Sequence, residues 1–427
     1  MKASLYSLSL VWLIAFTSCK KEVEKGQLIQ LTNTSEVELV DKPISIGKKL
    51  LSLNDSLVRY PLVLSQTDTI PSQLNDTDMD GQWDELFFVA DFMPKESKAI
   101  TLIWTDNEPI YEPRTSVRFG KRTSADKAVQ PATNETMLAN ELPKSLGYQQ
   151  YQTDGPSWEN DRVGFRHYLD GRNAKDLFGK KTSSMSPEDV GLDAAGAVED
   201  NYHVMEDWGR DILAVGNSVG LGGYALINET EFMRLGVTVE DSINNVEKTT
   251  FHIDVEGPVN SIISYGYNNW KPNNRTYSVK ETTSIWPGIY GFKNTVSVSG
   301  LTGDEDLAVG LVNINTDHSL SVLDENSKYV VLYTHDKQTY NKEWWLGMAL
   351  ILPKDKYLGF TQAPKTGPLS NSFLAKLKIE DNQPVSYYAI AGWELSDEKF
   401  SNETYFTYYL KKLTGQLSAV VEIEVKN

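Results

Sequence analysis

Short segments rich in Val, Ile, Thr and aromatic residues recur along most of this 427-residue chain, separated by turns rich in Gly, Asn, Asp and Pro. Such segments are typical of β-strands, and short connections between them favour antiparallel pairing. From residue 151 to the C-terminus they follow one another almost without a break. Only residues 397–413 show a clear apolar period near 3.6, which predicts one helix. The sequence therefore predicts an all-β fold with few helices.

Composition divides the chain into parts. Residues 28–110 predict a smaller N-terminal β-sandwich, and residues 111–150 predict a polar connector with short helical turns at 124–130 and 134–142. Residues 151–427 predict a large antiparallel β-sandwich that carries the catalytic site, and residues 416–425 alternate as its last strand should. A sandwich of this length resembles the galactose-mutarotase-like supersandwich domains of polysaccharide-active enzymes.

The first residues resemble a bacterial lipoprotein signal. Lys2 precedes an apolar run over residues 8–16, which is too short to span a membrane, and Cys19 follows as the only cysteine of the chain. The resemblance implies removal of the signal peptide at residues 1–18, diacylation of Cys19 and a charged tether over residues 19–27. We expect an exported protein that is lipid-anchored to a cell membrane, at the outer membrane or the periplasmic face, and has no disulfides.

The charge balance bears on the class of partner. The formal net charge is −17 and the sequence pI is about 4.8. Nucleic-acid binding requires basic patches, so no nucleic-acid partner is expected. An anionic ligand would need a local cluster of cations to offset the overall field.

An acidic loop lies between two predicted strands of the N-terminal part. Its pattern D-x-D-x-D-G-x-x-D places Asp76, Asp78, Asp80 and Asp84 as a calcium loop would, with glycine at the sixth position. The twelfth position lacks the bidentate glutamate of an EF-hand, and no helices are predicted beside the loop. The sequence predicts a structural calcium ion here, with an acidic hairpin turn as the alternative. No cofactor is expected for the chemistry.

The richest concentration of charged and aromatic side chains lies at residues 158–173. A strand over residues 163–170 would turn Phe165, His167 and Leu169 to one face. The other face would carry Arg162, Gly164, Arg166, Tyr168 and Asp170. Arginine binds carboxylates and sulfates through paired hydrogen bonds, so this face is predicted to lie under an anionic sugar. The alternative is an exposed sheet face with cross-strand ion pairs.

A second candidate segment spans residues 201–223. His203 stands there among acidic and aromatic residues, including Trp208 and Asp211, just before a glycine-rich stretch. The glycines do not form a phosphate loop, and no histidine pair has the spacing of a zinc site. A G-x-S-x-G hydrolase motif is absent. His203 is therefore the candidate proton acceptor of the chain.

Three segments, residues 70–92, 158–180 and 203–223, resemble the exported Bacteroidetes-type family known as domain of unknown function 4861, with a likeness that spans most of residues 30–420. Its members are encoded beside polysaccharide lyases and unsaturated-uronyl hydrolases. The nearest functional likeness is the ulvan-oligosaccharide dehydratase of marine alga-degrading bacteria. That enzyme removes water from a non-reducing-end uronate linked to rhamnose 3-sulfate and leaves a 4,5-unsaturated uronate.

A 4,5-dehydration requires neutralisation of the substrate carboxylate, a base for the C5 proton and an acid for the leaving oxygen. We assign His203 as base, Tyr168 as acid and Arg166 as the catalytic cation. The remaining assignments concern substrate binding. They are Arg162 as a second carboxylate clamp, Arg172 for a sulfate, Trp158 and Trp208 as stacking platforms, His167 as a reserve base, and Asp211.

Two other functions fit the same residues. A glycoside hydrolase would use a carboxylate pair drawn from Glu159, Asp161, Glu206 and Asp211. A non-catalytic glycan-binding surface lipoprotein would use only the aromatic platforms. Formation of the unsaturated uronate without chain shortening distinguishes the dehydratase from both alternatives.

Overall fold

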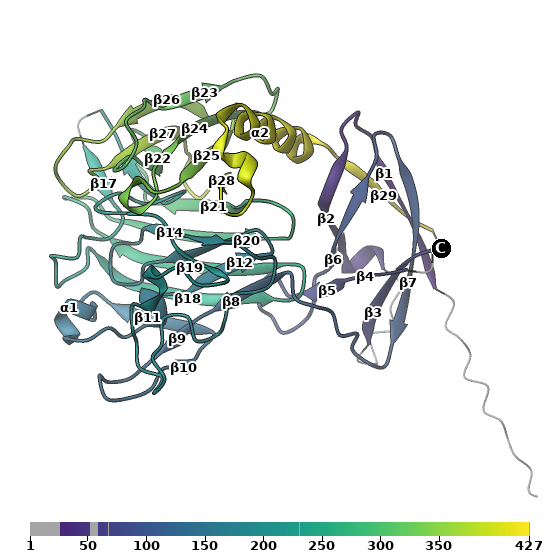
Figure 1. Ribbon diagram of the computed structural model, residues 1–427, viewed down its shortest axis with the longest axis horizontal. Coiled ribbons are helices and arrows are strands. Elements are labelled where there is room, and N and C mark those ends of the chain that lie inside the picture. The colour runs from purple at the N-terminus through teal and green to yellow at the C-terminus, as the bar shows by residue number, and fades with distance from the viewer. Residues whose placement is uncertain (1–25, 52–58, 67, 230, 427) are drawn as a thin grey trace, which may run out of the picture.

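The computed structural model describes residues 26–51, 59–66, 68–229 and 231–426. Strands dominate these ranges, and they form a large sandwich beside a smaller one (Figure 1). The prediction of an all-β, antiparallel sandwich fold with few helices is confirmed. The signal peptide at 1–18, Cys19 and nearly all of the tether fall outside the described residues. Among the described residues, no helix combines the length and the apolar character needed to cross a membrane.

A nine-stranded sheet is the centre of the large sandwich. Its strands are, in spatial order, β11 (Asn134–Leu138), β18 (Val246–Glu256), β19 (Ser261–Trp270), β20 (Tyr277–Ile285), β21 (Gly291–Ser299), β28 (Val385–Trp393), β25 (Trp345–Pro353), β24 (Tyr329–Lys337) and β23 (Ser321–Leu323). Neighbours pair antiparallel, as in the β19–β20 and β24–β25 ladders. Alternate residues of β20 are buried, so the two faces of the sheet pack against different partners.

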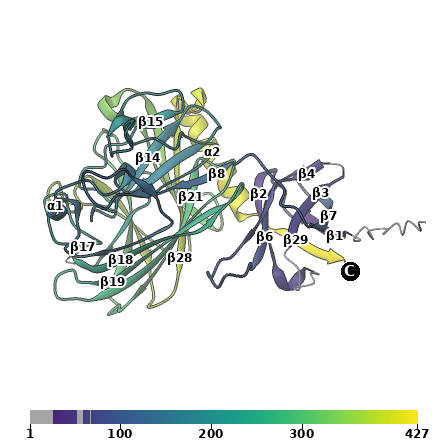
Figure 2. The ribbon, with the colours of Figure 1, turned by 90° about the horizontal axis from the view of Figure 1, so that it is seen from below.

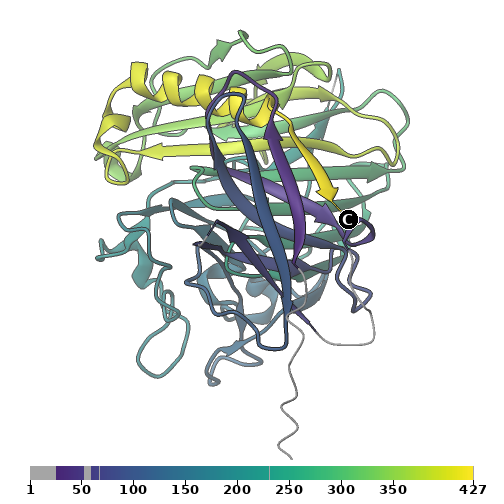
Figure 3. The same cartoon turned by 90° about the vertical axis from the view of Figure 1, so that its right-hand side faces the viewer.

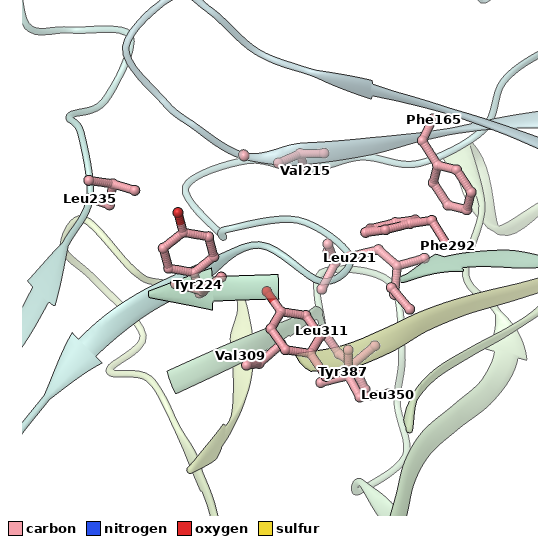
Figure 4. Packing of buried hydrophobic residues seen from close by; sticks show 14 of the residues in the cluster. Phe165, Val215, Leu221, Tyr224, Leu235, Phe292, Val309, Leu311, Leu350 and Tyr387 are labelled. Atoms are coloured by element: carbon pink, nitrogen blue, oxygen red, sulfur yellow. The ribbon is translucent and has the colours of Figure 1, made fainter. Parts of the chain in front are cut away.

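Two five-stranded sheets cover the inner face of this sheet. One runs β15 (Gly209–Asp211), β14 (Lys175–Lys180), β13 (Val163–His167), β12 (Ser157–Asn160), β8 (Thr115–Arg118). The other runs β17 (Phe232–Arg234), β16 (Tyr224–Ile227), β22 (Asp306–Val312), β27 (Ser372–Lys378), β26 (Tyr357–Gln362). Apolar side chains fill the space between the layers. Phe165 of β13 meets Phe292 of β21 edge to face, with ring centroids 4.7 Å apart (Figure 4).

The N-terminal sandwich has a five-stranded and a three-stranded sheet. The first is β29 (Val421–Lys426), β1 (Gln27–Asn33), β7 (Ser97–Thr105), β3 (Tyr60–Ser65), β4 (Asp68–Ile70), and the second is β2 (Leu39–Gly47), β6 (Glu85–Phe92), β5 (Ser72–Asn75). The prediction that residues 416–425 form the last strand of the large sandwich is wrong. They end helix α2 and begin β29, which pairs with β1, so the C-terminus belongs to the small sandwich.

Helix α2 (Glu403–Ser418) packs on the outer face of the nine-stranded sheet, where Phe406 and Leu410 are buried (Figure 3). It begins six residues later than the predicted start at residue 397. The Asn402 side chain accepts hydrogen bonds from the backbone N–H groups of Thr404 and Tyr405, which caps the helix there. Residues before this cap form the 3-10 turn η5 (Glu398–Ser401) instead.

The connector is more ordered than the sequence predicts. Residues 134–138, expected in a helical turn, form β11 because β18 offers them a complete antiparallel edge. Residues 124–130 form turns that lead into β10 (Gln130–Pro131), which pairs with β9 (Gly120–Lys121). Other short elements include η1 (Lys48–Leu50), η2 (Gln152–Asp154) and α1 (Pro143–Leu146), which has proline at its first position.

Candidate functional site

Strand β13 alternates as the sequence predicts. Phe165 points into the core, and so does His167, whose Nε2 lies 3.1 Å from the Tyr267 hydroxyl. Arg166 points to the outer face of its sheet, where its cross-strand partner is Asp176 of β14. This outer face is not open to water. Residues 181–208 run over it, and Val190 and Tyr202 bury Phe178 of β14 in a small apolar cluster.

Arg166 is the centre of a buried network of charges. Its Nη2 donates to Asp176 Oδ2 at 2.5 Å and to Asp211 Oδ2 at 2.6 Å. The Tyr168 hydroxyl donates to Asp176 Oδ2 at 2.5 Å. All four side chains are buried, and Arg166 is 1% exposed. Burial, followed by repulsion from the Asp176 carboxylate, raises the pKa of Asp211 well above its ordinary value.

Because both side chains are buried and bonded inside this network, the structure contradicts the catalytic roles assigned to Arg166 as cation and Tyr168 as acid. The Arg166 guanidinium lies between the rings of Tyr168 and Tyr202, 4.4 Å and 4.8 Å from their centroids. Its short hydrogen bonds go to Asp176, Asp211 and the hydroxyl oxygen of Tyr168. Arg166 therefore holds the two carboxylates in place, and the Tyr168 hydroxyl donates a hydrogen bond to one of them, Asp176. The sequence pattern identified the face but not the loop that covers it.

The network reaches solvent at His203, in η3 (Asn201–His203). His203 is 43% exposed, and its Nδ1 lies 3.6 Å from Asp211 Oδ2. The Tyr340 ring of η4 (Tyr340–Lys342) stands perpendicular to the imidazole, with centroids 5.8 Å apart. Burial, and next the Arg166 charge, lowers the pKa of His203, so the imidazole is neutral at pH 7. Burial and the nearby Asp211 raise the pKa of Tyr340.

Arg210 is the least committed cation at this opening. Its Nε donates to the backbone carbonyl of Asp211 at 3.0 Å, and its Nη1 lies 3.6 Å from a Glu343 carboxylate oxygen. The latter distance is too long for a hydrogen bond. The guanidinium faces the Trp344 ring at 5.6 Å from its centroid. Neither Arg210 nor Tyr340 is among the residues predicted from the sequence. Tyr340 reaches His203 only through the packing of a distant segment, whereas Arg210 lies seven residues after His203 in the same segment.

Four non-glycine residues with positive φ lie around the same opening. Thr153 and Asp154 have φ values of 49° and 59°, and Asn341 and Lys342 have values of 55° and 54°. Positive φ costs a non-glycine residue of order 1–3 kcal/mol. The Thr153 carbonyl accepts a hydrogen bond from Arg166 Nη1 at 3.4 Å. Two strained pairs beside one charged network mark this region as the candidate site.

Five other predicted substrate contacts lie elsewhere or are already committed. Trp158 is 1% exposed and packs on Phe165, so it belongs to the core. Trp208 is 8% exposed and packs on Phe178. Arg172 forms a paired bond with Asp170, through Nε at 2.7 Å and Nη2 at 2.6 Å. Arg162 is exposed, and its guanidinium lies 5.9 Å from the centroid of the Tyr290 ring, which is not part of the His203 opening. His167, the reserve base, is 1% exposed in the core.

Glu159 and Asp161, two of the four carboxylates proposed for a hydrolase, do not lie at this opening. Glu159 accepts hydrogen bonds from Lys180 and Ser186. Asp161 is held by Arg114 and by the backbone N–H of Gly288. Among these candidates, Asp211 alone contacts the Arg166 network within the described residues.

The acidic loop forms the β5–β6 hairpin connection. Oxygen atoms of Asp76, Asp78 and Asp84 lie within 4.8 Å of one another, whereas Asp80 is not part of this group. The carboxylates also accept backbone hydrogen bonds, as Asp76 does from Gly81 at 2.8 Å. These are the self-capping contacts of an acidic turn. The calcium ion therefore remains a prediction.

Calcium should raise the thermal unfolding midpoint of the protein if the loop binds it, because a ligand that binds only the folded state stabilises that state. At a concentration of 100 times its Kd the gain is about 2.7 kcal/mol. Scanning calorimetry with calcium and with a chelator measures the shift. The Asp78→Asn variant should lose it, and Asp68→Asn, an exposed change in the neighbouring β4, should keep it. An equal midpoint with and without calcium would contradict the metal site.

The fold and the site together define a two-sandwich β-protein with a buried Arg–Asp network that opens at a histidine. The chain belongs to the family described as "Domain of unknown function (DUF4861)", whose model matches residues 31–423. "Uncharacterized protein P7" of Formosa agariphila is 21% identical over 96% of each chain.

Solved structures offer only distant similarity. A protein of glycosyl hydrolase family 38 from Enterococcus faecalis covers 95% of this chain with a TM-score of 0.49 and 11% identity. An α-mannosidase from Enterococcus faecalis V583 covers 95% with a TM-score of 0.48 and 11% identity. This chain spans about half of each, 48% and 46% respectively.

Proposed function

We propose that this protein is a dehydratase that acts on anionic oligosaccharides of the ulvan type. It removes water from a uronic acid at the non-reducing end and leaves a 4,5-unsaturated uronyl group. The observation that carries the proposal is the meeting of His203, Tyr340 and Arg210 at the opening of the buried Asp211–Arg166 network. A neutral imidazole, a protonated phenol and a partly free guanidinium are the groups that a dehydration requires.

His203 takes the C5 proton of the uronate in this proposal. Asp211 lies behind Nδ1 of His203, which leaves Nε2 as the nitrogen for the substrate. The electron pair of the C5–H bond forms the C4–C5 double bond, and the C4–O bond breaks. The leaving oxygen takes a proton from Tyr340 and departs as water. At 3.6 Å the Asp211 carboxylate forms no hydrogen bond with Nδ1 of His203, but its negative charge favours the imidazolium that forms.

Arg210 holds the uronate carboxylate. The C5 proton is only weakly acidic while that carboxylate carries its full charge, so a nearby cation lowers the barrier. Glu343 faces Arg210 in the free protein at 3.6 Å, and the substrate carboxylate takes the place of this loose partner. Arg210 thereby replaces Arg166 in the role that the sequence pattern first suggested.

The proposal is tested by incubating the protein with uronate-terminated, sulfated oligosaccharides. Absorbance of the unsaturated uronate should rise while the chain length, measured by mass spectrometry, stays constant apart from the loss of one water. New reducing ends without that absorbance would indicate a hydrolase. Saturable binding with neither product would indicate the non-catalytic glycan-binding lipoprotein. Lipid attachment at Cys19 would appear in the intact mass of membrane-extracted protein.

The pH dependence of kcat/KM should follow the His203 imidazole. The base must be neutral, and burial together with Arg166 holds the pKa of His203 below its ordinary value of 6.5. Activity should therefore rise with pH through a midpoint below 6.5 and stay level to pH 8. Burial keeps the Tyr340 pKa above its ordinary value of 10.0, so the acid stays protonated over this range. A midpoint above 7 would point to a different base.

A further inference from the structure

A cavity lies where the small sandwich and helix α2 meet the outer face of the nine-stranded sheet. Its volume is about 390 Å³, within the range of about 300–1,000 Å³ typical of small-molecule sites. Figure 3 shows α2 and the small sandwich lying over this face. In Figure 2, α2 lies between the large sandwich and strand β2 of the small one. The His203 site, by contrast, lies on the outer face of the β13 sheet, on the other layer of the large sandwich.

The floor of the cavity is a row of side chains across four adjacent strands. Ile262 pairs with Ser284, Ser284 with Lys293, and Lys293 with Tyr388. The next row adds the hydroxyls of Thr282 and Thr295, which pair across β20 and β21. Hydroxyl groups beside aromatic and aliphatic side chains suit a sugar ring, which has polar edges and apolar C–H faces.

Lys293 is the side chain of this cavity whose charge has no compensating partner among the described residues. It is half-buried in the middle of β21, and within the described residues its ammonium has neither an ion-pair nor a hydrogen-bond partner. Burial lowers its pKa from the ordinary value of 10.5. Partial burial of a cation without a partner carries a desolvation cost, which an anionic ligand would offset.

The acids that line the cavity are committed elsewhere. Asp41 receives two hydrogen bonds from Arg114, at 2.7 Å and 2.8 Å. Glu85 is held by Ser45 and by Asn75. Lys42 adds a second cation, which donates to the Gln416 and Ala419 carbonyls at the end of α2. Because Arg114 neutralises Asp41, the two lysines outweigh the one remaining carboxylate, Glu85, and the lining has a net positive charge.

From this arrangement we infer that the cavity is a second binding site, for a carboxylate-bearing monosaccharide whose acid group pairs with Lys293. The hydroxyl rows of β20 and β21 contact the sugar hydroxyls. Phe87 of β6 and Leu417 of α2 cover the ring from the small sandwich and the helix. Because the cavity wall includes both sandwiches and the helix between them, a bound sugar also ties these parts together. This inference does not rest on the proposed dehydratase activity.

Lysine acylation tests the site on the intact protein. Limiting acetic anhydride is applied with and without D-glucuronate, and modified lysines are quantified by mass spectrometry. Glucuronate should slow acylation of Lys293 at least fivefold and leave Lys280, an exposed lysine of the neighbouring β20, unchanged. D-glucose, which lacks the carboxylate, should give less than twofold protection. Equal rates with and without glucuronate would overturn the inference.

Variants provide the second measurement. Saturation-transfer NMR should show the glucuronate affinity of Lys293→Met reduced at least tenfold, with Lys293→Arg retaining most of it and Lys280→Met unchanged. Arg210→Ala, at the candidate active site, should leave protection of Lys293 intact. If Arg210→Ala abolishes glucuronate binding and Lys293→Met does not, the sugar binds only at the His203 opening. That result would overturn the second site without touching the dehydratase proposal, which depends on the appearance of the unsaturated product.

Discussion

Replacing His203 by alanine should lower the rate of unsaturated-uronate formation by about 100- to 10,000-fold, the usual contribution of a positioned general base. The change removes the one imidazole that faces both solvent and Asp211. Because His203 is 43% exposed and lies in a short surface turn, the thermal midpoint should stay within a few degrees of the wild type. Initial rates from the absorbance assay, with calorimetry on the same samples, measure both effects.

The matched control is His252→Ala, which removes another exposed histidine from a strand on the opposite layer. It should retain the wild-type rate. Tyr340→Phe should lower kcat with less effect on KM, since it removes the proton donor and keeps the ring that packs against His203. Tyr408→Phe, at a 62% exposed tyrosine, should do neither. A fully active His203→Ala protein would place the base elsewhere.

Replacing Arg166 by methionine should destabilise the protein by about 3–5 kcal/mol, the cost of removing one partner of a buried ion pair. Asp176 and Asp211 would remain buried at 0% exposure without their cation. The sequence alone suggests loss of activity without unfolding, because it places Arg166 on a substrate face. Because Arg166 is buried, we also expect its replacement to lower the free energy of unfolding. Urea denaturation followed by circular dichroism measures the free energy of unfolding.

The double variant Arg166→Met/Asp176→Asn separates charge from packing. Removing one carboxylate together with the cation should recover part of the lost stability, so the two changes should be strongly non-additive. Arg162→Met, at an exposed arginine four residues away on the same segment, should change stability by less than about 0.5 kcal/mol. If Arg166→Met proved as stable as Arg162→Met, the buried network would not have the energetic role assigned to it.

The strand pattern and its two faces followed from local chemistry. A strand places alternate side chains on opposite faces, so Phe165 and His167 had to lie opposite Arg166 whatever the sheet around them. The acidic hairpin and the family motifs were accessible for the same reason, since each depends on residues close together in the chain. The all-β class followed from the composition of the individual strands. Asp211 was named with His203, and the two do meet, at 3.6 Å.

Local sequence patterns predicted neither the loop that covers the arginine face nor the long-range contacts of the site. No local pattern indicates that residues 181–208 fold over the arginine face, or that the turn at Tyr340 arrives beside His203. The last strand crosses to the small sandwich because β1 offers an open edge, although its alternation suits either sandwich equally well. Periodicity determines which way a side chain points. Only the packing of distant segments decides whether it meets water, a substrate or another buried charge.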